Sequence, residues 1–175
     1  MAINIIAENR KILEKRAAAL ARVEVARDDR LRLEVTSFRL GKECYAVETS
    51  LTREVIPLDG LTPLPCVPPF IAGIMNVRGR ILSLIDVKRL LGLPGECADN
   101  SKVIILSSGT MEFGLIVDSI DGVTSIPTEE IQGSMPTIDE KRNAYFRGIT
   151  ADRMIILDGG QMLKDPELVI HENVL

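Results

Sequence analysis

Short apolar runs alternate along the chain with Gly, Pro, Asp and Asn, a pattern typical of many short β-strands joined by tight turns. The first two runs, residues 36–40 and 43–47, flank Gly41-Lys42. Gly followed by another residue is the signal of a type II′ turn. The sequence therefore predicts a β-hairpin at this point.

A second hairpin is predicted from the apolar runs at 74–77 and 81–85, which flank Arg78-Gly79-Arg80. Gly79 is the turn residue best suited to positive φ. Arg78 lies between two buried strands, so we expect its side chain to face solvent. The four prolines of residues 63–69 fix φ and lack donors, which makes the preceding segment a stiff connector.

Two short helices are expected directly after strands. Asp86 stands where an N-cap belongs, residues 87–91 form the helix, and Gly92 ends it. The same order of strand, capping Asp and apolar helix recurs at Asp158, because RMIILD (153–158) echoes RILSLID (80–86). This echo suggests two similar small units, although the rest of the chain aligns too weakly to prove a duplication.

Further strands follow the same pattern of apolar runs and turn residues, with a polar loop at residues 136–141. They are expected at residues 54–58, 103–107, 111–117, 122–126, 145–150 and 154–157. Many short strands fit a barrel or a sandwich, and the spacing of the turns favours the barrel only weakly.

Residues 1–24 carry apolar positions at a period of 3.6, which predicts an amphipathic helix. Three roles fit this helix: packing on its own domain or forming a frayed arm, docking a partner, or lying on a membrane surface. A charge-dense linker follows it. The domains are therefore expected at 1–33 for the helical extension and linker, 34–170 for the β-domain and 171–175 for a tail.

The composition excludes several classes of function. The chain has 175 residues and a net charge of −4, with six aromatic residues and no Trp, which argues against a nucleic-acid surface. Its three cysteines lack CxxC spacing and it has one His, so we expect no metal site, no cofactor and free thiols in the cytoplasm. No apolar stretch is long enough to insert into a membrane.

The segment GIMNVRGRILSLID (73–86) resembles the signature of the CheW family, the coupling proteins of bacterial chemotaxis. FGLIVDSIDGV (113–123) is similar to a second family element. The resemblance covers about residues 37–163. It implies a mainly β fold of two five-stranded SH3-like barrels around a shared apolar seam.

The resemblance also implies a non-catalytic adaptor that joins the cytoplasmic tips of chemoreceptors to the regulatory domain of the histidine kinase CheA, at membrane-associated receptor arrays. The seam would offer an apolar groove to a receptor helix. By family position, the receptor-binding residues are Glu54, Gly73, Arg78 and Val123, with Asn76 shaping the turn that holds Arg78. Kinase-binding residues are not indicated.

Three other functions remain open. The same adaptor could serve a pathway of surface motility or pili, or be the coupling half of a larger receiver-bearing protein. The third is a small-molecule module or enzyme, for which Cys44 and Asp118 are the candidate groups. Cys44 has no nearby His to act as a base, which favours a buried strand cysteine. Asp118 fits a strand end that bonds an adjacent turn.

Overall fold

The structure is a computed structural model that describes residues 31–98, 100–133 and 143–168. Within these ranges the strands are β1 (Arg32–Leu40), β2 (Glu43–Glu48), β3 (Thr52–Pro57), β4 (Ile71–Val77), β5 (Arg80–Asp86), β6 (Lys102–Ser107), β7 (Glu112–Val117), β8 (Ser119–Pro127), β9 (Phe146–Ile149) and β10 (Ile155–Leu157). The helices are α2 (Val87–Leu91) and α4 (Gly159–Met162), with 3-10 turns η1 (Thr49–Leu51), η2 (Thr128–Glu130) and η3 (Pro166–Leu168). The helix expected at 1–24, the loop at 136–141 and the tail at 171–175 lie outside the described residues.

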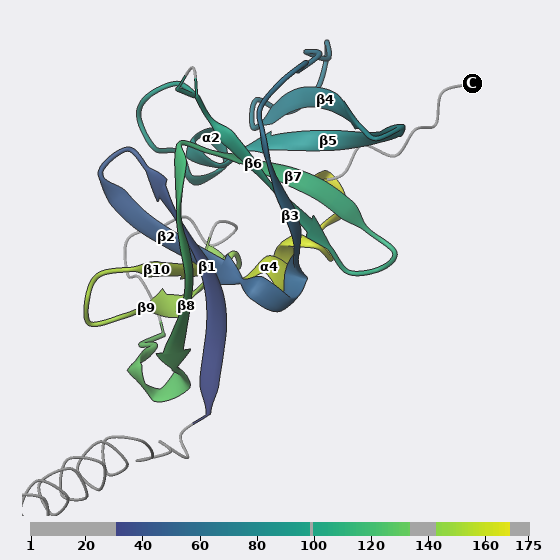
Figure 1. Cartoon of the computed structure of the whole chain (residues 1–175). Coiled ribbons are helices and arrows are strands. Elements are labelled where there is room, and N and C mark those ends of the chain that lie inside the picture. The colour runs from purple at the N-terminus through teal and green to yellow at the C-terminus, as the bar shows by residue number, and fades with distance from the viewer. Residues whose placement is uncertain (1–30, 99, 134–142, 169–175) are drawn as a thin grey trace, which may run out of the picture. The chain divides into compact units, whose positions relative to one another are not determined.

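The strands form two five-stranded sheets. One has the order β8-β1-β2-β10-β9 and is called barrel 1 here; the other has the order β3-β6-β7-β5-β4 and is called barrel 2. Figure 1 shows β4 and β5 of barrel 2 at the top and β9 and β10 of barrel 1 at the lower left. All strands of barrel 2 are consecutive in the chain, whereas barrel 1 combines the first two strands with the last three.

Each sheet curls until the segment after its first edge strand meets the opposite edge. Thr62, which follows β3, exchanges two backbone hydrogen bonds with Ile74 of β4, with N···O distances of 2.8 and 2.9 Å. Gln132, which follows β8, does the same with Ile149 of β9, at 2.9 Å in both directions. These bridges close both sheets into barrels.

The two barrels repeat one plan. In each, an antiparallel hairpin (β6-β7 or β1-β2) lies beside a second hairpin (β4-β5 or β9-β10), and the strands at the junction are parallel. The last strand of each second hairpin leads into a helix whose N-cap is an aspartate, Asp86 or Asp158. The similarity that RILSLID and RMIILD show in sequence therefore extends to the pairing of the strands.

Three apolar clusters fill the molecule. The largest packs both sheets and both helices together and includes Phe38, Tyr45, Val47, Ile85, Leu106, Leu115, Leu157 and Met162. A second fills barrel 2 and a third fills barrel 1. The fold is thus mainly β, with two five-stranded barrels around a shared apolar core, as predicted. The members of the shared cluster are buried, so the seam is filled with side chains instead of offering them to a partner.

Most element boundaries fall within two or three residues of those predicted. The first hairpin has Gly41 at φ +62, as the first central residue of a type II′ turn requires. β1 begins at Arg32, inside the stretch expected to be linker, because β8 is long enough for Pro127 to pair with Arg32. The side chain of Arg32 then binds Ser125 at 3.0 Å through Nε.

Candidate functional site

The turn between β4 and β5 is two residues long and holds a strained arginine. Arg78 has φ of +51 and Gly79 has φ of +82, the backbone of a type I′ hairpin turn. The left-handed conformation is unfavourable for a residue with a Cβ. Asn76 stabilises the turn, because its Oδ1 accepts a hydrogen bond from the backbone N of Gly79 at 2.8 Å. Asn76 therefore has the geometry expected of a residue that shapes this turn.

Arg78 reaches from this turn to the edge strand β3. Its Nη2 lies 3.0 Å from Oε2 of Glu54. The Arg78 side chain is 77% exposed, whereas Glu54 is only 18% exposed. One end of the arginine is therefore fixed by a largely buried carboxylate, while most of its guanidinium remains in contact with solvent.

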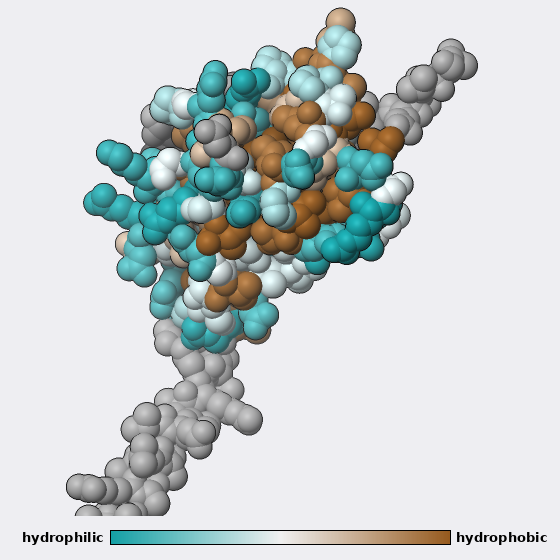
Figure 2. Space-filling model, turned by 45° about the horizontal axis from the view of Figure 1, so that its top comes forward, coloured by the Kyte–Doolittle hydropathy of each residue, from teal (hydrophilic) through white to brown (hydrophobic). Residues whose placement is uncertain are grey.

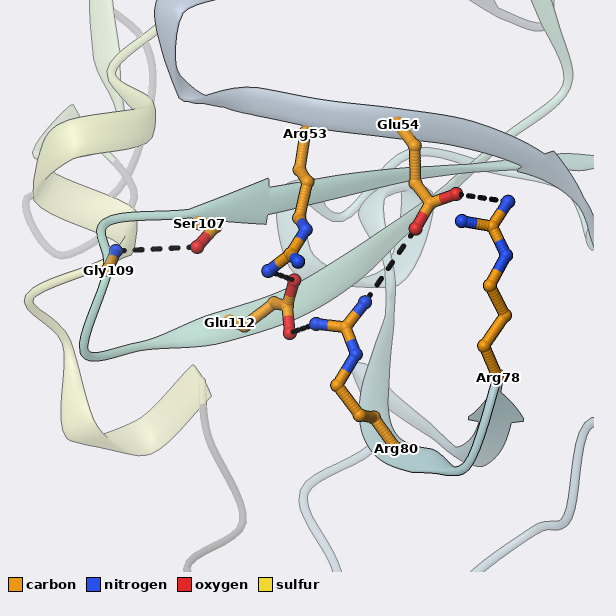
Figure 3. Close-up of polar contacts among 7 residues, drawn as sticks. All are labelled: Arg53, Glu54, Arg78, Arg80, Ser107, Gly109 and Glu112. Atoms are coloured by element: carbon orange, nitrogen blue, oxygen red, sulfur yellow. Dashed lines mark hydrogen bonds and ion pairs between the residues drawn. The ribbon is translucent and has the colours of Figure 1, made fainter.

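Glu54 belongs to a longer chain of ion pairs (Figure 3). Nη2 of Arg80 lies 3.7 Å from Oε1 of Glu54, and Nη1 of the same guanidinium binds Oε2 of Glu112. Nη1 of Arg53 lies 3.1 Å from Oε1 of Glu112. The resulting order, Arg53–Glu112–Arg80–Glu54–Arg78, is called the charged chain here.

The charged chain forms at one end of barrel 2 because of strand register. Side chains alternate between the two faces of a strand, so Arg80 shares a face with Leu82 and Leu84, which lie in the barrel interior. By the same alternation, Glu112 shares a face with Ile116 of that interior cluster. Both charged residues are the first of their strands, and they face one another where the apolar filling ends.

Gly73 and Val123 are not members of the charged chain. Gly73 is buried near the other end of β4, beside the Thr62–Ile74 bridge. Val123 lies on β8 of barrel 1, opposite Thr36, with 63% of its surface exposed. The structure thus brings together Glu54, Asn76 and Arg78 from the set expected from the family, while Gly73 lies within β4 and Val123 lies on β8.

Exposed apolar side chains accompany the charged groups. Val55, next to Glu54 on β3, is 41% exposed, and Ile81, next to Arg80 on β5, is 54% exposed. Figure 2 shows apolar surface gathered in the middle of one face and bordered by hydrophilic residues. Val55 and Ile81 therefore add exposed apolar surface to the two strands, β3 and β5, that carry Glu54 and Arg80.

The two aspartates at the helix starts have structural contacts. Oδ1 of Asp86 accepts a hydrogen bond from the backbone N of Arg89 at 3.2 Å, and Oδ1 of Asp158 accepts one from Gln161 at 2.9 Å. Asp86 also lies 3.4 Å from the Sγ of Cys97. Burial and the charge of Asp86 raise the pKa of the Cys97 thiol to about 11.

The two candidate groups for catalysis have other partners. Asp118 accepts a hydrogen bond from the backbone N of Gly41 at 2.6 Å and forms a 2.7 Å ion pair with Lys88, so it binds the turn of the first hairpin, as expected of a strand end. A buried cysteine was predicted at position 44, but Cys44 is only half-buried in the structure. The reason is its place at the end of the barrel, beside Asp121. Burial and Asp121 raise the pKa of Cys44, which keeps it a thiol.

Neither a metal site nor a membrane helix is found in the part of the chain that the structure describes. No group of three His, Cys, Asp or Glu side chains in these ranges could hold an ion. None of the helices in the same ranges has the length and apolar composition needed to cross a bilayer.

Sequence reasoning missed Arg53, Arg80 and Glu112. Their partners come from strands far apart in the chain, so local spacing gives no signal for the pairing. One indication was present for Arg80, because alternation along RILSLID places it on the same face as Leu82 and Leu84. A charged residue on an interior face must lie near the end of a barrel or find a partner.

Known proteins match both the sequence and the fold. The family model of the CheW-like domain matches residues 34–167. The chain is 30% identical over 161 residues to the chemotaxis protein CheW of Klebsiella aerogenes. This alignment covers 90% of this chain and 97% of that protein. It is 26% identical over 113 residues to protein PilI of Pseudomonas aeruginosa, with 64% of each chain covered.

A solved structure agrees with these matches. The crystal structure of the scaffolding protein TtCheW from Thermoanaerobacter tengcongensis superposes with a TM-score of 0.65 at 31% sequence identity, over 73% of this chain and 90% of that one. Residues 34–167, which the family model matches, contain the charged chain and all strands of both barrels except the first two residues of β1. The protein therefore belongs to the CheW family, whose members are non-catalytic adaptors of chemotaxis.

Proposed function

We propose that this protein couples the cytoplasmic tips of chemoreceptors to the histidine kinase CheA and is thereby recruited to membrane-associated receptor arrays. Membership of the CheW family supports an adaptor role. The kinase partner would be the regulatory domain of CheA, which has the same fold. An adaptor of this kind needs two separate surfaces, one for each partner.

Arg78 is the observation that carries the receptor side of this proposal. A guanidinium offers five N–H donors in a planar fork, and it pairs well with carboxylates and carbonyls. Glu54 engages one end of Arg78, and the exposed remainder is free to bind an acceptor on the receptor tip. Arginine is also one of the residues enriched at the hot spots of protein interfaces.

The other receptor-side residues contribute in different ways. Glu54 orients Arg78, and Asn76 keeps the turn in its conformation through Gly79. Gly73 acts through the closure of barrel 2, because it is buried beside the Thr62–Ile74 bridge. Val123 offers exposed apolar surface on β8.

The test is a binding experiment with purified receptor tip fragment and purified CheA regulatory domain. Arg78→Ala is expected to weaken receptor binding by about 1–3 kcal/mol, as for a hot-spot residue, and to leave kinase binding unchanged. Arg39→Ala is the matched control. Arg39 is also a partly exposed arginine in an ion pair, at 2.9 Å from Asp121, and it lies in barrel 1.

Two results would contradict the proposal. If the unaltered protein binds neither fragment, coupling is not its function. If Arg78→Ala and Arg39→Ala weaken receptor binding equally, Arg78 is not a specific contact. Loss of both partners in one variant together with a lowered melting temperature would indicate unfolding, which circular dichroism of each variant detects.

The similarity to protein PilI favours a second candidate, the same adaptor role in a chemosensory pathway other than chemotaxis. The two candidates differ in the receptors and kinase that the protein serves. Binding titrations against receptor and kinase fragments from each chemosensory gene cluster of the source organism would separate them.

A further inference from the structure

We propose that Glu112 and Arg80 are positioning residues for partner binding, which hold Glu54 in the orientation that keeps Arg78 available. The inference rests on the proposed function of Arg78. It extends the binding site from the turn between β4 and β5 to the first residues of β5 and β7.

Glu112 is the centre of the charged chain. Its two carboxylate oxygens bind different arginines, Oε1 that of Arg53 and Oε2 that of Arg80. Its side chain is only 17% exposed. A carboxylate that is mostly buried and engaged on both oxygens has little freedom to rotate, so it fixes the position of Arg80.

Arg80 is shared between two carboxylates. It binds Glu112 closely through Nη1, while its Nη2 remains 3.7 Å from Oε1 of Glu54. Oε2 of Glu54 is thereby left to Arg78, at 3.0 Å. Without Glu112, the guanidinium of Arg80 would be free to take both oxygens of Glu54 in the bidentate geometry that arginine favours. Arg78 would then lose its anchor.

The net charge of the charged chain also indicates what kind of group binds at Arg78. Three arginines and two glutamates leave an excess of one positive charge, and the most exposed member is Arg78 at its end. The end of barrel 2 therefore suits an acidic side chain of a partner. Of the two arginines at the ends of the charged chain, Arg78 is the more exposed, at 77% against 54% for Arg53.

Barrel 1 provides evidence that a barrel of this plan does not need the charged chain in order to fold. Aligning the capping residues Asp86 and Asp158 places Leu115 of β7 at the position of Val47 of β2, because each pairs with the residue just before its cap. Three residues earlier, Glu112 corresponds to Cys44. Barrel 1 thus has a thiol where barrel 2 has the central carboxylate.

The bulged residues of the edge strands differ in the same way. In β3, Arg53 is left unpaired by a register shift between Thr52 and Glu54. In β8, Asp121 is left unpaired by the shift opposite Ser37 and Phe38. Among the described residues, the side chain of Asp121 contacts Cys44 and forms an ion pair with Arg39. The additional charges of barrel 2 are therefore not a requirement of the plan that the two barrels share.

A double-mutant cycle tests the inference. The affinity of the full-length protein for a purified receptor tip fragment is measured by calorimetry for Glu112→Gln, Arg78→Ala and the double variant. Glu112→Gln is expected to weaken binding about fivefold, and to have no further effect once Arg78 is alanine, because it acts through Arg78. CheA affinity serves as the readout of the second surface and should not change.

Asp121→Asn is the control, since it removes the charge of a carboxylate that pairs with an arginine of barrel 1 without touching the charged chain. Arg80→Lys is a second test that does not depend on Glu112→Gln folding well. It keeps the charge and loses the planar fork that reaches two carboxylates. We expect it to weaken receptor binding to a similar degree.

The outcomes are distinguishable. If Arg78→Ala weakens receptor binding while Glu112→Gln and Arg80→Lys do not, or if Glu112→Gln has the same effect in both backgrounds, the positioning role is wrong and the proposed function stands. If Arg78→Ala has no effect, the receptor assignment and the positioning role fail together.

Discussion

Gly73 and Gly148 occupy matching places in the two barrels, each against the carbonyl that closes its own barrel. A Cβ on Gly73 would overlap the backbone oxygen of Thr62, and a Cβ on Gly148 would come within 2.5 Å of the backbone oxygen of Gln132. Gly73 also has φ of +150, a conformation that residues with side chains rarely adopt. These glycines allow the closing segment to pair with the opposite edge of the sheet.

Gly73→Ala is expected to lower the free energy of unfolding by about 2–4 kcal/mol, because both backbone strain and steric overlap must be relieved. Receptor binding would then fall through loss of folded protein. Gly133→Ala is the control, since a Cβ there meets nothing within 4 Å. Urea denaturation of both variants gives the comparison, and equal midpoints would contradict the role of Gly73 in closure.

Arg78 combines a strained backbone with a functional side chain, so the two properties can be separated. Arg78→Gly removes the Cβ that makes φ of +51 unfavourable, and we expect it to be about 1 kcal/mol more stable than Arg78→Ala. Both variants lack the guanidinium and should bind the receptor fragment equally weakly. Denaturation and binding titrations of this pair check the prediction; a stability order of Ala above Gly would refute it.

Lys88 and Asp118 form an ion pair that connects the two barrels. The side chains are 9% and 19% exposed and 2.7 Å apart, and Asp118 also accepts a hydrogen bond from the backbone of Gly41. Asp118→Ala is expected to cost about 3–5 kcal/mol of stability, because it leaves a buried ammonium without its carboxylate.

The double variant Lys88→Met with Asp118→Asn should recover most of that loss. Its asparagine can still accept the hydrogen bond from Gly41, and its methionine needs no counter-charge. Urea denaturation of Lys88→Met, of Asp118→Asn and of their double variant measures the coupling. Simple additivity of the two single losses would show that the pair does not act as a unit.

Cys97 is expected to react slowly with alkylating reagents near neutral pH. Burial, followed by the charge of Asp86, raises its pKa from 9.0 to about 11. The thiol of Cys97 therefore keeps its proton to a higher pH in the folded state than in the unfolded state. Its contribution to the stability of the folded state is complete below pH 9 and is lost as the pH rises through about 11.

The rate of iodoacetamide labelling against pH, in a variant with Cys44→Ser and Cys66→Ser, measures this pKa. The same labelling experiment with Asp86→Asn added shows the effect of the Asp86 charge. Asparagine is also a good N-cap, so this substitution removes only the negative charge. The midpoint should move to lower pH in that variant. A midpoint near 9.0 with Asp86 present would contradict the expected effect of burial.

Local features of this fold were predictable from sequence, because they depend on residues close together in the chain. The turns at Gly41 and Gly79 and the cap at Asp86 each follow from the conformational preferences of a few neighbours. The exposure of Arg78 followed from its place between two apolar runs. The choice of a barrel over a sandwich came from family resemblance, since strand spacing alone left a sandwich open, while the echo of RILSLID in RMIILD already suggested two units.

The contacts that build the candidate site were not predictable in this way. The parallel pairing of β5 with β7 joins strands that are separated by α2 and β6, and it brings Arg80 to Glu112. The burial of Lys88 likewise depends on Asp118, which belongs to a later strand end. Such pairs are set by the register of distant strands, about which a single sequence carries little local information.

The division of barrel 1 between the two ends of the chain has a consequence for folding during synthesis. All strands of barrel 2 leave the ribosome before β8, so this barrel can close while the hairpin of β1 and β2 still lacks both of its neighbours, β8 and β10. Until β10 is made and pairs with β2, the edge of β2 is open to strand pairing with other chains. The newly made protein is thus most exposed to aggregation in the interval between the completion of β7 and the arrival of β10.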